Sequence, residues 1–419
     1  MRAPAFPYHG IDLYYSIMTK NFLDRANDVL INVYPFWPIQ IERGDGVYLV
    51  DTDGKKYLDF GSGIAVNALG YHYPGYDETI KNQLDKIHMR LCYIASEDRL
   101  KAAETLVEKS DFDQVFFCST GAEAVEGCLK TARKWATETK GQDAFEIIYV
   151  AESFHGRTMG ALSVNGQDDL REGFEPLLPG THQAVFNDLD SVQSKINKNT
   201  AAIIVEPVMG EGGIIPAEQE FLEGLRMLCD THDIALIFDE VQCGIGRIGT
   251  LFAYQYYNVV PDLVAWAKGL GGGYPVGAFM GQKKFTSHIT PGSHGSTYGG
   301  APIACEVVDF MIREISKPEI LDNVTQMGAY LREELKKIGH NTGAFSNVRG
   351  LGLMIAADYN HGDVKDFIKA ALKNGLVVLK CGDNALRLLP PLIITREHVD
   401  EAMQKLRKTI EDLDEKKAH

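Results

Sequence analysis

The chain has 419 residues, 45% hydrophobic and 24% charged, a composition typical of a soluble globular protein rather than a disordered, fibrous or membrane protein. Its 42 basic and 57 acidic residues give a formal charge of −15 without a sustained lysine or arginine block, which disfavours nucleic-acid and anionic-membrane partners. The N-terminal residues lack a basic segment followed by a long apolar run, so we expect a cytoplasmic protein. Seven scattered cysteines without a CxxC pair argue against a disulfide framework or a zinc ribbon, and we expect no metal.

The predicted elements begin with a polar helix ending near Leu30, followed by a small antiparallel meander between residues 38 and 60. From about Tyr76, helical patterns alternate with short apolar runs. Helices are expected over 97–109, 122–136 and 219–233, and strands over 114–118, 146–150, 201–206, 234–240 and 262–267. Because apolar runs between helices are typical of strands buried on both faces, this section predicts a mostly parallel sheet, with ligands at the carboxyl ends of the strands.

After about residue 315 a second α+β pattern begins. It predicts a helix over 319–339, short strands near 347–358 and 376–381, and a final helix near 396–413. The expected fold class is α/β, with a large domain around a mostly parallel central sheet flanked by helices and a small α+β domain built from both chain ends. We place the N-terminal segment and part of the small domain in 1–75, the large domain in 76–315, and the C-terminal part of the small domain in 316–419.

Two ionisable side chains stand where predicted buried strands end. Asp239 lies at the end of the apolar run 234–240, and Lys268 follows the run 262–267 directly before a glycine-rich segment. A buried carboxylate needs a cation, a metal or hydrogen bonds, although an aspartate that caps the turn at the strand exit also fits. Desolvation would lower the pKa of Lys268 and make it a Schiff-base nucleophile, whereas a lysine on a surface loop would be unremarkable.

Two further segments suit anionic ligands. In 115–133 a strand, a Ser-Thr-Gly turn and an amphipathic helix follow one another, which places backbone N–H groups and hydroxyls around a point suited to phosphate. Plain N-capping by Thr120 explains this segment equally well. In 153–162 an aromatic residue, a histidine and Arg157 share one loop, where the arginine could grip a carboxylate or form a surface salt bridge.

Together these segments supply a lysine nucleophile, a carboxylate able to hold a protonated ring nitrogen, a phosphate cup and an aromatic ring for stacking. This set predicts pyridoxal phosphate. A nearby buried carboxylate raises the pKa of the pyridine nitrogen by favouring its cation, and the protonated ring then acts as an electron sink. Asp239 suits that role.

Over essentially its whole length the chain resembles the class III, fold type I, pyridoxal-phosphate-dependent aminotransferases, and most closely their acetylornithine aminotransferase subgroup. Eight motifs occur in the order typical of the family, at 48–74, 118–124, 153–158, 205–213, 238–247, 267–278, 293–300 and 387–395.

The resemblance implies roles for the cofactor-binding residues. Lys268 corresponds to the lysine that binds the cofactor covalently and moves the proton, and Asp239 to the partner of the ring nitrogen. The other positions that correspond to cofactor contacts are Thr120, Gly121 and Ala122 at the phosphate, Phe154 and Val241 at the ring, Gln242 near the phenolic oxygen, and Glu206. Thr297 corresponds to a threonine that reaches the phosphate from the neighbouring subunit, which implies a homodimer.

The resemblance also implies the substrates, an ω-amino donor such as N-acetylornithine and the acceptor 2-oxoglutarate. Arg157 corresponds to the carboxylate-binding arginine. Glu211 and Arg387 correspond to a pair in which the glutamate masks the arginine until an α-carboxylate must be bound, which permits dual specificity. The remaining substrate positions implied are Ser296, Tyr34 and Ile64, the last of which is a tyrosine in some ornithine enzymes.

Other functions remain open within and beyond the family. Ornithine δ-aminotransferase, 4-aminobutyrate aminotransferase and other ω-amine aminotransferases are alternatives, because Ser119-Thr120-Gly121 replaces the usual Asn-Ser-Gly and Ala301 replaces an asparagine. An NAD-dependent oxidoreductase fits less well, because the G-x-G-x-x-G match at 244–249 does not open a helix directly after a strand. A catalytically silent relative would be expected to lose Lys268 or Asp239, and both are present.

Overall fold

The computed structural model describes residues 21–418 and confirms the predicted fold class. Its largest sheet has seven strands in the order β4-β12-β11-β10-β7-β5-β6. These strands are β4 (Gln114–Cys118), β5 (Glu146–Val150), β6 (Thr181–Ala184), β7 (Thr200–Val205), β10 (Ala235–Asp239), β11 (Leu263–Trp266) and β12 (Gly277–Gly281). Neighbouring strands from β11 to β6 pair in parallel, whereas β12 runs antiparallel to both β11 and β4.

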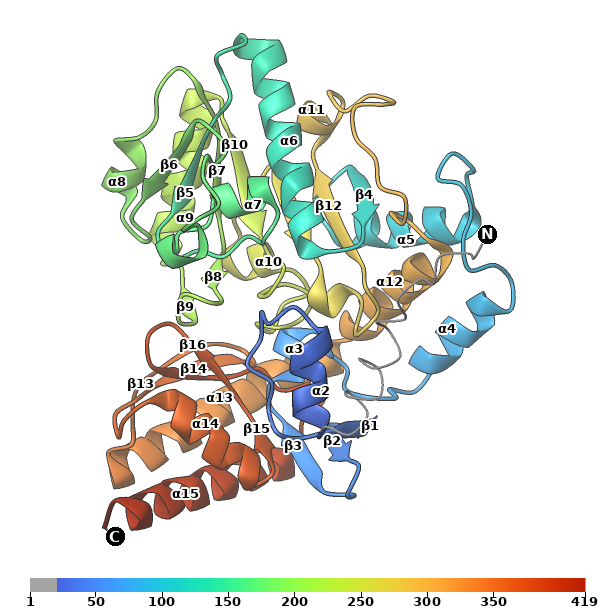
Figure 1. The fold of residues 1–419 in the computed structure, drawn as a ribbon. Coiled ribbons are helices and arrows are strands. Elements are labelled where there is room, and N and C mark those ends of the chain that lie inside the picture. The colour runs from blue at the N-terminus through green and yellow to red at the C-terminus, as the bar shows by residue number, and fades with distance from the viewer. Residues whose placement is uncertain (1–20, 419) are drawn as a thin grey trace, which may run out of the picture.

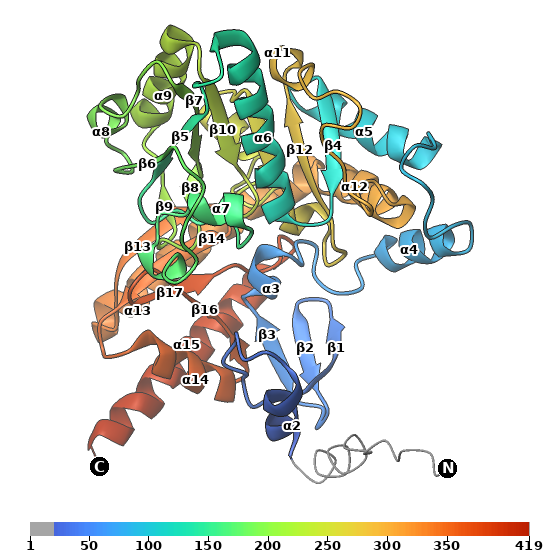
Figure 2. The ribbon, with the colours of Figure 1, turned by 45° about the horizontal axis from the view of Figure 1, so that its top comes forward.

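Helices cover both faces of this sheet, as Figure 2 shows for α6 (Gly121–Lys140) in front of the strands. Side chains alternate between the two faces of a strand, so neighbouring residues of β10 belong to different cores. Leu236 and Phe238 pack in a cluster with Leu222 of α9 (Gln219–His232), whereas Ile237 packs in a cluster with Leu129 of α6. The strand is therefore buried on both sides, as its apolar run predicts.

The remaining helices of the large sheet's layers lie around its edges and ends (Figure 1). They are α4 (Tyr76–Leu84), α5 (Glu97–Lys109), α7 (Met159–Ser163), α8 (Leu189–Gln193), α10 (Ala253–Tyr257), α11 (Lys283–Thr286) and α12 (Pro302–Ile315). The helix predicted over 97–109 agrees with α5, and the one over 219–233 with α9 to within one residue. The short strands β8 (Val208–Met209) and β9 (Ile215–Pro216) pair with each other.

Both chain ends contribute to a second structural layer, and Figure 1 shows the N-terminal strands beside the C-terminal helices. One sheet has the order β1-β2-β3-β15, in which β15 pairs in parallel with β3 through Leu376 and Leu58. The other has the order β13-β14-β17-β16. The strands are β1 (Ile41–Asp45), β2 (Tyr48–Asp51), β3 (Lys56–Asp59), β13 (Phe345–Leu351), β14 (Met354–Tyr359), β15 (Leu376–Val377), β16 (Leu379–Cys381) and β17 (Ala385–Leu388).

Four helices complete this layer, namely α2 (Phe22–Val29), α13 (Pro318–Thr342), α14 (Val364–Lys373) and α15 (Arg396–Ala418). The antiparallel pairing of β1, β2 and β3 matches the predicted meander. Helix α2 is the end of the predicted N-terminal helix, whose first twenty residues lie outside the described residues. The exact domain boundaries stay a prediction. No helix within residues 21–418 combines the length and the apolar character needed to cross a membrane.

The segment between β3 and α4 contains a left-handed helical turn, α3 (Ser62–Ala65). Its four residues have φ values of 47°, 62°, 64° and 63°, and the turn closes with backbone hydrogen bonds from Val66 and Asn67 to the carbonyl of Ser62. Left-handed helical backbone costs an L-residue roughly 1–2 kcal/mol, and a β-branched residue such as Ile64 is rare there. The surrounding structure must therefore hold this turn in place.

Candidate active site

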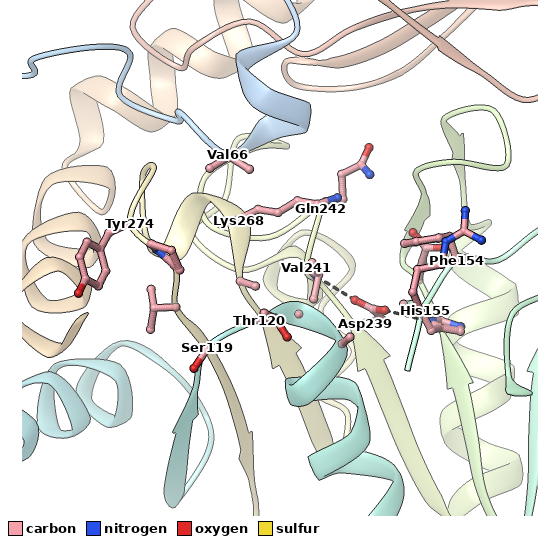
Figure 3. A pocket seen from close by; sticks show the side chains of 18 of the residues that line it. Val66, Ser119, Thr120, Phe154, His155, Asp239, Val241, Gln242, Lys268 and Tyr274 are labelled. Carbon is pink, nitrogen blue, oxygen red and sulfur yellow. Dashed lines mark hydrogen bonds and ion pairs between the residues drawn. The ribbon is translucent and has the colours of Figure 1, made fainter. Parts of the chain in front are cut away.

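A cavity of about 510 Å³ lies where five strands of the large sheet end. Residues at the ends of β4, β5, β7, β10 and β11, or within a few positions beyond them, all contribute to its wall, because the carboxyl ends of parallel strands meet at one edge of a sheet. Figure 3 shows these side chains facing a common space. The lining residues are Val66, Ser119, Thr120, Gly121, Ala122, Phe154, His155, Gly156, Arg157, Glu206, Asp239, Val241, Gln242, Ala267, Lys268, Gly273, Tyr274, Pro275 and Val276.

Lys268 begins the short helical turn η2 (Lys268–Leu270) directly beyond β11. Its backbone is left-handed, with φ of 47°, so a strained residue presents the amine to the cavity. Desolvation lowers the pKa of Lys268, an effect that the Glu211 carboxylate opposes. An amine with a lowered pKa is more often unprotonated at neutral pH, which is the form that attacks a carbonyl.

Asp239, the last residue of β10, is 3% exposed and forms a dyad with His155. Nδ1 of His155 lies 2.7 Å from Asp239 Oδ2, and the amide of Val241 donates to Asp239 Oδ1 at 3.0 Å. Because a carboxylate only accepts, the His155 ring carries its proton on Nδ1 in this contact. The side chain of Asp239 is therefore fixed at both oxygens while it lines the cavity.

His155, the other member of the dyad, was given no role from the sequence. His155 is noted in the 153–162 loop only as a neighbour of Arg157, and its partner lies 84 positions away. Among the described residues its Nε2 is buried and has no hydrogen-bond partner. The signal that could have found it is a histidine next to a stacking aromatic residue in a loop that follows a buried strand.

The N-terminus of α6 forms part of the cavity wall. Thr120 caps this helix, since its Oγ1 accepts from the amide of Glu123 at 3.2 Å, while the Glu123 carboxylate accepts from the amides of Ser119 and Thr120. The alternative prediction for this segment, that Thr120 caps the helix, is therefore confirmed. The same residues nevertheless line the cavity, together with Gly121 and Ala122.

Gly121 allows this helix end to approach the neighbouring wall. A Cβ atom at position 121 would lie 2.8 Å from Cγ1 of Val241, closer than real side chains pack. Amides of a helix's first turn have no acceptor within the helix, and the helix dipole adds positive potential there. This end of the cavity therefore suits an anionic group.

Glu206 holds the loop that carries Phe154. Its carboxylate accepts from the Phe154 amide at 2.9 Å and from the Gly210 amide at 3.0 Å. Burial and the nearby Asp239 raise the pKa of Glu206. The guanidinium of Arg157 lies 5.6 Å from the centre of the Phe154 ring. The loop thus presents an aromatic face and an arginine to the cavity from adjacent positions.

Glu211 and Arg387 form an ion pair beside the cavity, with 2.5 Å between Oε1 and Nη1. Gln242, which lines the cavity, donates to Glu211 Oε1 at 3.3 Å. Burial alone would raise the pKa of Glu211, but the charge of Arg387 and its hydrogen bond lower it. Arg387 comes from β17, so the pair joins the large sheet's layer to the layer built from both chain ends.

Six of the predicted site residues are not part of the cavity wall in the single chain, namely Glu211 and Arg387, which pair beside it, and four others. Tyr34 is 70% exposed and Ile64 is 40% exposed, and Thr297 is likewise exposed. Ser296, its neighbour, is half-buried and is not part of the cavity wall. Ten other predicted positions, from Thr120 to Lys268, share the wall.

The residues present fit pyridoxal 5′-phosphate. The cavity offers a desolvated lysine, a fixed carboxylate at a strand end, a helix N-terminus and an aromatic face, all on one wall. These are the groups that the cofactor's aldehyde, ring nitrogen, phosphate and ring require. The segment 244–249, which resembles a nucleotide-binding motif, forms turns and opens no helix, so it does not build a dinucleotide site.

Comparison with known proteins agrees with this geometry. The family model described as aminotransferase class-III matches residues 32–410. The chain belongs to the class III aminotransferases. The aminotransferase is 44% identical over 379 residues to the acetylornithine aminotransferase of Clostridium acetobutylicum, covering 90% of this chain and 98% of that protein. It is also 42% identical over 382 residues to the acetylornithine aminotransferase of Aquifex aeolicus, covering 91% and 99%.

Solved structures show the same fold. The ornithine aminotransferase of Toxoplasma gondii ME49 superposes with a TM-score of 0.91 at 28% identity, covering 97% of this chain and 99% of that one. The N-acetylornithine aminotransferase of Stenotrophomonas maltophilia K279a gives a TM-score of 0.80 at 35% identity, with coverage of 91% and 97%. The predicted family, enzyme class and cofactor are thereby confirmed, and the protein is a pyridoxal-phosphate-dependent aminotransferase.

Proposed function

We propose that this aminotransferase moves the terminal amino group of N-acetylornithine to 2-oxoglutarate, giving the semialdehyde and glutamate. The Glu211–Arg387 ion pair carries this proposal, because an enzyme with two chemically different substrates needs one binding group that can be hidden and exposed. The similarity to two acetylornithine aminotransferases over nine-tenths of the chain supports the choice of donor.

We assign the cofactor-binding roles to the cavity wall. When bound, pyridoxal phosphate supplies an electron sink for the carbon that loses its proton. Thr120, Gly121 and Ala122 hold the phosphate, and Lys268 binds the cofactor and moves the proton at the reacting carbon. Asp239 keeps the ring nitrogen protonated, because a fixed negative charge favours the cation.

Other residues of the cavity wall are assigned to the pyridine ring of the cofactor. In this assignment Phe154 and Val241 would contact the ring, and Gln242 would serve the phenolic oxygen. Glu206 positions Phe154 through its backbone amide. Such contacts would exclude water from the reacting carbon and orient the cofactor, which would limit side reactions.

For the substrates, Arg157 binds the carboxylate of the donor with two parallel hydrogen bonds. The donor is bound while Glu211 neutralises Arg387. When the acceptor enters, Glu211 moves away and Arg387 binds its α-carboxylate. A bound carboxylate then replaces the Glu211 carboxylate, so the nearly fully buried Arg387 is never left without a counter-charge.

We also propose that the active unit is a homodimer in which Thr297 of one subunit reaches the phosphate of the other, with Ser296, Tyr34 and Ile64 completing the substrate site. Large exposed apolar side chains on 84–100 and at Tyr298 support an interface. They are Leu84, Ile87, Leu91, Tyr93, Ile94, Leu100 and Tyr298. Analytical ultracentrifugation should give twice the 46.4 kDa chain mass, and a monomer with full activity would contradict the proposal.

A donor panel tests the proposed substrate. N-acetylornithine, ornithine and 4-aminobutyrate are each supplied with 2-oxoglutarate, and both glutamate and the second product are identified. We expect kcat/KM for N-acetylornithine to exceed that for the other donors by at least about tenfold, which corresponds to one net hydrogen bond of about 1.4 kcal/mol. Equal or higher kcat/KM for ornithine would contradict the choice, and the fold similarity to ornithine aminotransferases makes this the alternative to measure first.

A further inference from the structure

The left-handed turn Ser62–Ala65 reaches the active-site cavity through the residue that follows it. Val66 lines the cavity, and Figure 3 shows it at the end of α3, on the side where Lys268 lies. Ala65, by contrast, is 3% exposed and packs in a cluster with Met354 and Leu389. The turn therefore lies where the chain passes from the core, at Ala65, to the cavity wall, at Val66.

A buried carboxylate clamps the start of this turn. Asp59, the last residue of β3, is 1% exposed, and its Oδ1 accepts from the amides of Gly61 at 3.0 Å and Ser62 at 2.8 Å. Its other oxygen accepts from the hydroxyl of Tyr71 at 2.8 Å. Burial raises the pKa of Asp59, and these three hydrogen bonds oppose that effect by stabilising the ionised form.

Tyr71 connects the clamp to the loop behind Lys268. Its hydroxyl also accepts from Asn67 Nδ2 at 3.1 Å. The Oδ1 atom of Asn67 packs closely against Gly273, since it would lie 3.0 Å from a Cβ atom placed there. Gly273 in turn lines the cavity. Gly44 makes room for Tyr71, because a Cβ at that position would overlap its ring at 2.2 Å.

The same segment is tied to two further parts of the site. Tyr76 donates its hydroxyl to the carbonyl of Gly271 at 2.7 Å, three residues beyond Lys268. On the other side, the amide of Leu389 donates to the carbonyl of Phe60 at 2.7 Å, two residues beyond Arg387. Residues 59–76 therefore bridge the lysine loop and the strand that carries the substrate arginine.

We propose that Asp59 and Tyr71 are positioning residues of the active site, which hold the strained turn so that Val66 and the loop at Gly273 form a wall for the aliphatic chain of an ω-amino donor. This rests on the proposed function in so far as the donor has such a chain. Neither residue lines the cavity, so both act through the turn. Strained backbone persists only where neighbours over-determine it, and it concentrates at functional sites.

Tyr71→Phe tests the proposal in the holoenzyme, because it removes one hydroxyl and keeps the ring that Gly44 accommodates. We expect KM for the best ω-amino donor to rise about three- to tenfold while kcat stays within about twofold, the effect of loosening a binding wall and not the reacting atoms. The ratio of kcat/KM between long and short ω-amines should fall by a similar factor. Backbone amides in 60–68 should exchange with deuterium at least about tenfold faster.

The chain offers a matched control. Tyr73 also donates its hydroxyl to a carboxylate, that of Glu314 at 3.1 Å, but within residues 21–418 it neither lines the cavity nor hydrogen-bonds to Asp59 or the turn 62–65. Tyr73→Phe should leave KM, the donor ratio and exchange in 60–68 unchanged. If KM and the donor ratio stay unchanged in Tyr71→Phe, the proposal is wrong. A fall in kcat and thermal stability with constant KM and donor ratio would show that the clamp is only structural.

A second pair of variants keeps the test decisive if one protein folds poorly. Asp59→Asn keeps an oxygen that can accept from the Gly61 and Ser62 amides, whereas Asp59→Ala removes both contacts. KM in Asp59→Asn should lie closer to wild type than KM in Asp59→Ala, and equal KM values in both would overturn the role. These KM comparisons use whichever ω-amine the wild-type enzyme prefers. If that amine is not N-acetylornithine, the proposed function is wrong, but the role of Asp59 and Tyr71 can still be tested.

Discussion

The two ends of the cavity are built in different ways. At the cofactor end, Asp239, Lys268 and the α6 N-terminus all lie at the carboxyl ends of strands of a single sheet, and each takes part in backbone or side-chain hydrogen bonds to nearby residues. At the substrate end, Glu211 and Arg387 come from different layers of the molecule. Their side chains meet in an ion pair beside Gln242, and the backbone carbonyl of Glu211 accepts from the Gly382 amide of the other layer.

The difference matches the tasks of the two ends. The cofactor stays in place through both halves of the reaction, so its contacts gain from rigidity. The substrates alternate, so a contact that opens and closes is useful only where its partners lie on elements that need not move together. Substitutions at the cofactor end should therefore remove chemistry, whereas substitutions at the substrate end should change selectivity.

Lys268→Ala should have the largest effect. Without the amine, no group at that position can move the proton at the reacting carbon, so steady-state turnover should fall by at least about 10⁴-fold. Rapid-mixing spectroscopy with donor and acceptor measures this, and Lys369→Ala on the exposed face of α14 serves as a control. Turnover within tenfold of wild type would show that another residue performs the proton transfer.

Asp239→Asn comes next. Asparagine retains the shape but not the negative charge that favours a protonated ring nitrogen, so kcat should fall by on the order of 10²–10³-fold. His155 should remain bound, because an amide oxygen still accepts from its Nδ1–H. The absorption spectrum of the bound cofactor reports ring protonation, and an unchanged spectrum with unchanged kcat would refute the role.

Glu211→Gln should have a smaller and selective effect. Removing the negative charge leaves Arg387 unmasked, so we expect donor kcat/KM to fall about tenfold and glutamate to become a better donor. Half-reaction kinetics with each amine separate the two changes. A uniform loss for every substrate would indicate that the pair is structural and not a selectivity device.

Lys268→Met should have the smallest effect, on the stability of the cofactor-free protein. Desolvation lowers the pKa of Lys268 below its unfolded value, so near neutral pH the unfolded chain holds this proton more strongly than the folded chain. That penalty is absent above the unfolded pKa of about 10.4 and grows as the pH falls towards the folded pKa. Urea unfolding should show the variant more stabilised at pH 7 than at pH 10.5. A constant difference would contradict the pKa shift.

Much of the cofactor end could be predicted from the sequence, because buried strands leave continuous apolar runs and the residues that end such runs are conspicuous. The predicted strand over 234–240 agrees with β10, and Asp239 lies at its end. Helix α12 was not predicted. Ten of its fourteen residues are buried, and a largely apolar run of this kind is not distinguished from a buried strand by composition alone.

Contacts between distant residues could not be predicted from local patterns. His155 meets Asp239 across 84 positions, and Glu211 meets Arg387 across 176, so the latter pair followed only from family resemblance. The left-handed turn was not predicted either, because Ile64 disfavours that conformation. Asp59 accepts hydrogen bonds from the Gly61 and Ser62 amides, and the Tyr71 hydroxyl, twelve positions away, binds its other oxygen. Roles of individual site residues stay predictions until variants are measured.

The most direct test of the central claim is to reduce the holoenzyme with borohydride and locate the bound cofactor by peptide mass spectrometry. The account predicts one pyridoxyl-phosphate adduct per chain, on Lys268, and none in Lys268→Ala. An adduct on a different lysine, or no adduct in a protein that still transfers amino groups to 2-oxoglutarate, would contradict it.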